Sequence, residues 1–267
     1  MRVVQYAVAF AVGASLAGGA MAQTAPAAPE KETWAGPFGG SFTATFAFAT
    51  DYSYRGISQT QREVAVQPSA TYEVPLFGSP ISAYVGAWAS NVKFLGSNAN
   101  PEVDLITGFR AKAFDEKLTA DLGYIRYMYW GGDRASFFDF DEYGLVLGYD
   151  FGVASVTGAV RYSPNFYANS GIAWYKWGQI SVPLTFVKLH DEVALKVFAT
   201  LGHQYVERNL NYGIGANGYL DWQVGVGVSL FGVDLAVSYT DTDLDSPNCG
   251  NTLNCEARVI FTISKTF

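Results

Sequence analysis

The side chains that most often perform chemistry are scarce in this sequence. Its 267 residues include two cysteines and two histidines, too few for a cluster of Cys and His ligands around zinc. Neither His190 nor His203 belongs to a catalytic motif such as G-x-S-x-G, which would place a nucleophile near its base. An enzyme is therefore the weakest functional hypothesis, and we expect no cofactor and no metal.

The two cysteines, Cys249 and Cys255, lie in a segment rich in Asp, Asn and Gly. In an oxidising compartment, such a pair is expected to form a disulfide that constrains a long loop. Three aspartates at 241–245 resemble the start of an EF-hand calcium loop. Ser246 and Thr252 replace the Gly and Glu that this loop requires, which favours a solvated acidic loop.

Composition and charge exclude further classes. Charged residues make up 15% of the chain and aromatic residues 16%, whereas an average soluble domain has about 25% charged residues. The formal net charge is −7, so the chain lacks the basic surface that captures nucleic acid. We therefore expect neither an ordinary cytosolic enzyme nor a nucleic-acid partner.

The first residues predict export. Arg2 precedes an apolar stretch at 3–16, and Ala20-Met21-Ala22 fits the small-x-small cleavage pattern of a signal peptide. We expect a signal peptide at 1–22, a flexible Ala/Pro-rich periplasmic linker at 23–37, and one folded domain at 38–267.

From Phe38 onward, apolar side chains alternate with polar or small ones along much of the chain. The segment 220–230 reads LDWQVGVGVSL, in which six apolar side chains at even positions face polar or small residues at odd positions. Comparable segments occur at 40–54, 64–74, 82–92, 102–114, 118–129, 138–151, 153–162, 173–186, 193–204, 219–230, 233–241 and 256–267. Strands of ~9–11 residues can cross a bilayer when tilted.

The connections between these segments alternate in length. Short ones, such as FGV at 231–233, alternate with mostly longer ones that are rich in Gly, Asn, Asp and Ser, such as 240–255. An even strand number with this one-sided asymmetry is typical of outer-membrane barrels. The sequence therefore predicts an all-β fold, an antiparallel up-and-down transmembrane β-barrel of about twelve strands.

Aromatic residues are expected where the strands pass through the membrane interfaces. For the outer rim we predict Tyr52, Tyr54, Tyr127, Trp130, Tyr143, Trp174 and Tyr239, and for the inner rim Tyr72, Tyr149, Phe231 and Phe267. A secreted β-sandwich would also alternate, but it would not need long strands and one-sided loops together.

The last predicted strand is amphipathic and ends in Phe267. A terminal Phe on such a strand resembles the signal that the barrel assembly machinery of the outer membrane recognises. Lys265 departs from this pattern, in which an apolar residue is usual, although its amine can reach the lipid headgroups.

The first predicted strand and the segments after it carry a more specific resemblance. The run DYSYRGISQ at 51–59, AVQP at 65–68 and YVGAWASN at 84–91 resemble the opening of the TorF family of proteobacterial porins. The resemblance is strongest over roughly the first 70 residues after the predicted signal peptide. It implies a small outer-membrane barrel with a transport role, and it brings no catalytic residue, cofactor or known substrate.

Side chains at alternate positions of a predicted strand share one face, and we assign the polar face of each strand to the barrel lumen. The resulting lumen candidates include Asp51, Arg55, Arg110, Lys112, Asp121, Glu142, Arg161, Lys196, Asp221 and Arg258. Because both signs occur, these charges can form a selective pore or can pair and close the lumen. Twelve strands lie between the filled interior of eight and the aqueous channel of sixteen.

Arg55 has two interpretations. It shares a predicted lumen face with Asp51 at the outer end of the first strand. Arg55 contacts a permeating anion in one interpretation and forms an internal pair with Asp51 in the other.

The hypothesis we favour is a narrow passive channel for small hydrophilic solutes in the bacterial outer membrane. The alternative is a non-conducting structural or adhesive barrel whose outer loops bind a partner. The expected partners are outer-membrane lipid with lipopolysaccharide, the barrel assembly machinery and a small hydrophilic solute.

Overall fold

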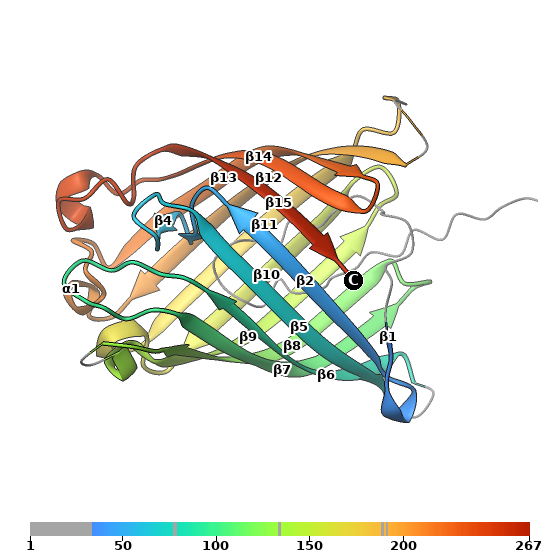
Figure 1. Ribbon diagram of the computed structural model, residues 1–267, viewed down its shortest axis with the longest axis horizontal. Coiled ribbons are helices and arrows are strands. Elements are labelled where there is room, and N and C mark those ends of the chain that lie inside the picture. The colour runs from blue at the N-terminus through green and yellow to red at the C-terminus, as the bar shows by residue number, and fades with distance from the viewer. Residues whose placement is uncertain (1–33, 77–78, 133–134, 188–189, 191) are drawn as a thin grey trace, which may run out of the picture.

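The computed structural model describes residues 34–76, 79–132, 135–187, 190 and 192–267. The predicted signal peptide and most of the predicted linker lie outside the described residues. Twelve antiparallel strands form one closed barrel (Figure 1). They are β2 (Ser41–Ala49), β5 (Ala65–Pro75), β6 (Ile81–Ser90), β7 (Glu102–Ala113), β8 (Leu118–Tyr129), β9 (Phe140–Asp150), β10 (Ser155–Ser163), β11 (Ala173–Pro183), β12 (Val193–Val206), β13 (Gly218–Leu230), β14 (Val233–Thr242) and β15 (Arg258–Thr266).

The other elements are short. β1 (Trp34–Ala35) pairs with the start of β2, and β3 (Ser53–Tyr54) pairs with β4 (Ile57–Ser58) in a separate two-stranded sheet. Single helical turns occur at Pro37–Gly39, Ala135–Phe138, Tyr167–Asn169, Asn209–Tyr212 (α1) and Ser246–Cys249. In the described part of the chain, no helix has the length and apolar character needed to cross a membrane.

Each strand pairs with its sequence neighbours, and β2 closes the ring. It pairs with β5 on one side and with β15 on the other. The observed bounds of the later strands lie within three residues of those predicted. The first predicted strand, 40–54, is wrong at its end, because β2 stops at Ala49.

The two ends of the barrel differ as predicted. One end, here called the turn end, carries mostly short connections such as 231–232 between β13 and β14. The other end, here called the loop end, carries longer connections such as 50–64, 207–217 and 243–257.

The outward face of the barrel is apolar. Leu122 is 61% exposed and Phe109 54% exposed, although both lie in the middle of their strands. Further members of this belt are Phe46, Phe48, Val85, Leu105, Leu145, Leu147, Val224, Val226, Val237, Phe261 and Ile263. A contiguous apolar surface of this kind suits lipid rather than water. The predicted fold class, an all-β transmembrane barrel of twelve strands, is confirmed.

Three predicted rim aromatics point inward instead. Tyr52 and Tyr127 are 0% exposed and Tyr54 is 6% exposed, so none of them faces lipid. Tyr127 stacks on Phe140 with ring centroids 4.1 Å apart. These rings belong to an interior core that fills the loop end of the barrel.

Candidate functional site

The connection between β2 and β5 folds into the barrel. Residues 50–64, here called the inward hairpin, carry β3 and β4 and the turn Arg55-Gly56 between them. Arg55 has φ 51° and Gly56 has φ 80°, as expected for a two-residue hairpin turn of the type that suits twisted strands. The alternation of this segment therefore describes a small hairpin inside the lumen and not an extension of the first strand.

Arg55 forms an ion pair across the lumen. Its Nη2 donates to both carboxylate oxygens of Glu142 on β9 at 2.6 Å, and its Nη1 donates to Oε1 of Gln204 on β12 at 2.5 Å. Arg55 is therefore internally paired, but the predicted partner Asp51 is wrong. The real partner lies 87 positions further along the chain.

Aromatic rings enclose the same guanidinium. Its central carbon lies 4.3 Å from the ring centroid of Tyr175 and 4.6 Å from that of Tyr54. Phe166 completes the enclosure at 5.5 Å. Burial lowers the pKa of Arg55, but the charge of Glu142, its hydrogen bond to the guanidinium and the nearby Tyr54 and Tyr127 together hold the pKa above its ordinary value. Arg55 thus stays charged although its side chain is buried.

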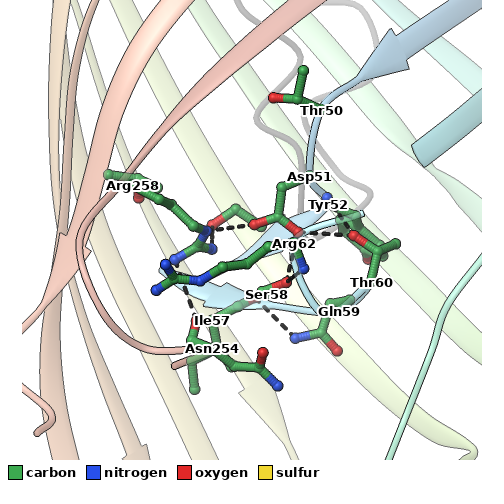
Figure 2. A network of polar contacts seen from close by, with 12 residues as sticks. Thr50, Asp51, Tyr52, Ile57, Ser58, Gln59, Thr60, Arg62, Asn254 and Arg258 are labelled. Carbon is green, nitrogen blue, oxygen red and sulfur yellow. Dashed lines mark hydrogen bonds and ion pairs between the residues drawn. The ribbon is translucent and has the colours of Figure 1, made fainter. Parts of the chain in front are cut away.

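Asp51 anchors the base of the inward hairpin (Figure 2). Its Oδ1 accepts hydrogen bonds from the hydroxyls of Ser58 at 2.6 Å and Thr60 at 2.8 Å. Its Oδ2 is ion-paired with Nε of Arg258 on β15. The Nη1 of Arg258 also donates to the carbonyl of Gly56 at 2.8 Å. Two buried ion pairs, one at the base and one at the tip, therefore hold the hairpin in the lumen.

A second charged group lies nearer the turn end. Arg110 Nε donates to Asp121 at 2.9 Å, and its Nη1 donates to Glu73 at 2.5 Å. The Tyr84 hydroxyl donates to Asp121 at 2.8 Å, and the guanidinium of Arg110 lies 4.1 Å from the Tyr84 ring centroid. This group lines the wall and does not cross the lumen.

The remaining predicted lumen residues divide into two sets. Arg161, Lys196 and Asp221 are buried inside the barrel as predicted. Lys112 lies on the lumen face of its strand but at the turn-end rim, where its side chain is 48% exposed and pairs with Glu116 at 3.2 Å. Lys112 therefore contacts water at the rim and not the enclosed lumen.

A family model described as a bacterial protein of unknown function (Gcw_chp) matches residues 31–267. The chain belongs to the Gcw_chp family. The TorF name is not part of that match, and it stays a prediction. No curated protein matches the sequence.

Several solved outer-membrane proteins are similar in structure to this Gcw_chp protein. The NanC porin is 10% identical, with 85% of this chain and 98% of that chain covered and a TM-score of 0.48. LpxR from Salmonella typhimurium is 10% identical, with 84% and 99% covered and a TM-score of 0.46. The outer membrane channel DcaP of Acinetobacter baumannii is 9% identical, with 88% and 99% covered and a TM-score of 0.39. Because these scores are below 0.5, the likenesses say nothing about what the Gcw_chp protein binds.

Sequence reasoning missed some of the residues that shape the site of this Gcw_chp protein. Glu102 is 1% exposed and accepts a hydrogen bond from the Tyr52 hydroxyl at 2.9 Å. Glu102 and Asp104 lie two positions apart on β7, on the face that alternation assigns to the lumen, so the spacing of these two acids was a sufficient signal to find Glu102. Gln204 lies on the same face of β12 as Lys196, so alternation could have placed it in the lumen. Its role, like that of Phe166, depends on where the tip of the inward hairpin lies, and no pattern in the sequence gives that position.

Burial also determines the protonation state of Tyr52 in the inward hairpin. Burial raises the pKa of Tyr52 well above its ordinary value, and the charge of Glu102 adds to the effect. The Tyr52 hydroxyl of the Gcw_chp protein therefore stays protonated and donates to the carboxylate.

The predicted disulfide between Cys249 and Cys255 is present in the last loop-end connection. Asp245 in the same loop receives a hydrogen bond from the backbone N–H of Asn248 and so caps a helical turn. We expect alkylation of the unreduced, unfolded Gcw_chp protein to label no cysteine, and alkylation after reduction to label two. Labelling of two cysteines without reduction would contradict the pairing.

Phe267 lies where the barrel closes. Its backbone N–H donates to the carbonyl of Ala44 at 2.8 Å, and its carbonyl accepts from the Ala44 N–H at 3.1 Å. The last residue of the Gcw_chp protein thus continues the β2–β15 ladder. Its role as an assembly signal stays a prediction.

Proposed function

We propose that this Gcw_chp family member is an outer-membrane channel through which small hydrophilic solutes diffuse passively. The observation that supports this most is the polar lumen. Its wall toward the turn end is lined by Thr43, Thr45, Ser69, Thr71, Ser82, Thr119, Thr157, Gln179, Ser181, Thr200, Gln223, Ser229, Ser238, Thr262, Ser264 and Thr266. The lumen leads from these short side chains to the Arg55–Glu142 pair near the loop end.

A barrel that only had to be stable would not need this interior. Buried ion pairs are often replaced by apolar residues with no loss of stability, and an apolar filling would suffice for a structural role. Among the described residues, four basic and six acidic side chains are buried: Arg55, Arg161, Lys196 and Arg258, and Asp51, Glu102, Asp104, Asp121, Glu142 and Asp221. A path for polar solutes would explain why the barrel keeps buried charged side chains that are costly for its stability.

The inward hairpin makes the proposed passage narrow. It places Tyr54 and Arg55 in the middle of the loop end, where the surrounding core is packed. We therefore propose a constricted channel and not a wide general pore. The same packing also favours the alternative, a non-conducting structural or adhesive barrel, and the test must separate the two.

Outer-membrane localisation is part of the proposal. Its support is the apolar outward belt, the amphipathic last strand and the predicted signal peptide. The proposed contacts are lipid and lipopolysaccharide on the belt and the barrel assembly machinery at the last strand. The proposed function includes no chemical step, because neither His190 nor His203 faces the lumen: one lies in a turn-end connection and one on the outward face of β12.

The test is single-channel conductance of the refolded protein in a planar bilayer. We expect discrete, reproducible current steps, with heat-unfolded protein in the same detergent as the control. Absence of steps from protein that is inserted and shifts in gel mobility on heating would overturn the channel and leave the non-conducting barrel.

A further inference from the structure

A lysine and a histidine lie side by side on the lipid face of the barrel. Lys176 on β11 and His203 on β12 are directly opposite each other in the ladder that joins these strands. Both are exposed, and His203 lies two positions from Leu201, which is 56% exposed on the same face. Among the described residues, neither side chain has a hydrogen-bond or ion-pair partner. The pair therefore presents free nitrogen donors to the surroundings of the barrel.

Another outward base near the same end has a partner within the chain. Arg126 on β8 forms an ion pair with Asp141 on β9 at 2.8 Å. The acids that follow β12 and β14, Glu207 and Asp243, accept hydrogen bonds from backbone N–H groups at 2.9 and 2.8 Å. A positive charge on the lipid face of a barrel is costly. The missing acid beside Lys176 therefore points to an anion that comes from outside the chain.

The depth of the pair indicates which part of the membrane it contacts. Lys176 lies three positions from the loop-end terminus of β11, and His203 lies three positions from that of β12. Three residues of a strand tilted by about 45° span about 7 Å of depth. The pair is therefore near the lipid headgroups and not at the midplane. Longer connections lie on the outer side of such barrels, which places the pair in the outer leaflet.

Aromatic rings flank the pair toward the loop end. Trp174 and Tyr205 are directly opposite each other, two positions nearer that end, and each is 40% exposed. Tyr162 packs against Trp174 with ring centroids 4.7 Å apart. Trp and Tyr are enriched at the membrane–water interface. The rings therefore support a headgroup-level position for Lys176 and His203.

Toward the turn end, the lipid face beside Lys176 lacks side chains. Gly158 on β10 and Gly178 on β11 are directly opposite each other, and Gly178 lies two positions from Lys176. An added Cβ would meet nothing nearer than 4.0 Å at Gly158 and 3.9 Å at Gly178, so packing within the chain does not require glycine there. Glycine inside a strand weakens it and often marks a place where a ligand approaches closely. The two glycines expose backbone on which an acyl chain can lie.

We propose that this surface, here called the lipid notch, binds a phosphorylated glycolipid of the outer leaflet, lipopolysaccharide, through a phosphate group. Lys176 supplies the positive charge, His203 donates a hydrogen bond to a phosphate oxygen, and an acyl chain lies over Gly158 and Gly178. The inference rests on the proposed outer-membrane location and names the binding site for one lipid of that membrane. It does not depend on conductance.

The test is calorimetric titration of bisphosphorylated lipid A into the refolded protein in a nonionic detergent. We expect saturable binding to the wild type. The double variant Lys176→Gln/His203→Gln should bind at least about tenfold more weakly, the factor for losing a hydrogen bond to a charged group. Lipid A without its phosphates should bind the wild type as weakly as lipid A binds the double variant. Equal binding of the two lipids would overturn phosphate recognition.

Lys93→Gln is the matched control. Lys93 follows β6 at the same end of the barrel, and its ammonium forms an exposed ion pair with Glu63. This variant loses the same charge as Lys176→Gln, but outside the lipid face. We expect the affinity for lipid A to equal that of the wild type. An equal loss of affinity in Lys93→Gln and Lys176→Gln would mean that only net charge matters, which would overturn the lipid notch.

Gly158→Leu tests the acyl contact without removing a donor. The added side chain has room, so the thermal unfolding midpoint should stay the same or rise. Because the leucine would occupy the place of the acyl chain, lipid A should bind more weakly than to the wild type. Unchanged binding in a folded Gly158→Leu variant would overturn the assignment of the acyl chain to this backbone.

The remaining outcomes separate the possible sources of the phosphate and the two proposals. If inorganic phosphate displaces lipid A from the wild type at equal concentration, the site takes free phosphate, and the lipid assignment is overturned. If the wild type conducts but does not bind lipid A, only this inference fails. If it binds lipid A but does not conduct, the channel fails and the lipid notch stands.

Discussion

Replacing Arg55 with Ala is expected to release the inward hairpin and to lower the free energy of unfolding by about 3–5 kcal/mol. The substitution leaves the Glu142 carboxylate, which is 1% exposed, buried without its cation. It also removes the contacts of the guanidinium with the rings of Tyr54 and Tyr175. Because this side chain pins the hairpin tip, single-channel conductance should increase while the barrel wall stays intact. Thermal unfolding in detergent and planar-bilayer recording measure the two effects.

Two further variants make this result specific. Arg62→Ala removes a guanidinium from the same hairpin, but this guanidinium donates to the backbone carbonyls of Leu253 and Glu256, so its loss leaves no carboxylate unpaired. We expect a small loss of stability and unchanged conductance. Combining Arg55→Ala with Glu142→Gln should recover part of the lost stability, because no buried charge is then uncompensated. Equal effects of Arg55→Ala and Arg62→Ala would contradict the role of the tip.

Replacing Gly56 with Ala should produce the second large effect, by steric means and not by charge. Gly56 has φ 80°, and an added Cβ would lie 2.3 Å from Cγ2 of Thr242 and 2.9 Å from Cβ of Asp221. The left-handed backbone costs about 1–2 kcal/mol for an L side chain, and overpacking adds about 1–3 kcal/mol. We expect a loss of about 2–5 kcal/mol and an increased conductance, measured as for Arg55→Ala.

Gly96→Ala separates the cost of the left-handed backbone from the cost of overpacking. Gly96 has φ 73°, but an added Cβ would meet nothing within 4 Å. This variant should therefore show the backbone cost of about 1–2 kcal/mol alone and unchanged conductance. If both glycine variants behave alike, the hairpin turn does not pack against β13 and β14 as described.

Strand parity predicted most of the fold and most of the lumen wall. Asp121, Glu142, Arg161, Lys196, Asp221 and Arg258 are all buried on the face that alternation assigned to them. This works because side chains alternate strictly along a strand, and because lipid outside and polar groups inside give each face one character.

Alternation could not show where a strand leaves the wall. Tyr52 and Tyr54 continue the spacing of β2, so parity placed them on the lipid face, although the chain had already turned inward after Ala49. It also could not identify the partner of Arg55. The pairing with Glu142 depends on how far the hairpin reaches across the lumen, and a one-dimensional pattern carries no such distance.

The closure of the barrel affects how the chain folds. The ladder between β2 and β15 joins five residue pairs, whereas β2 and β5 join nine. The hydroxyls of Thr45 and Thr266, 3.0 Å apart at this ladder, are 221 positions apart in the sequence. Closing so long a loop costs more entropy than forming a hairpin between sequence neighbours, and non-local pairing is slow. We therefore expect β2 and β15 to pair last during folding, and a chain halted before this step to present two unpaired strand edges on which other chains can add.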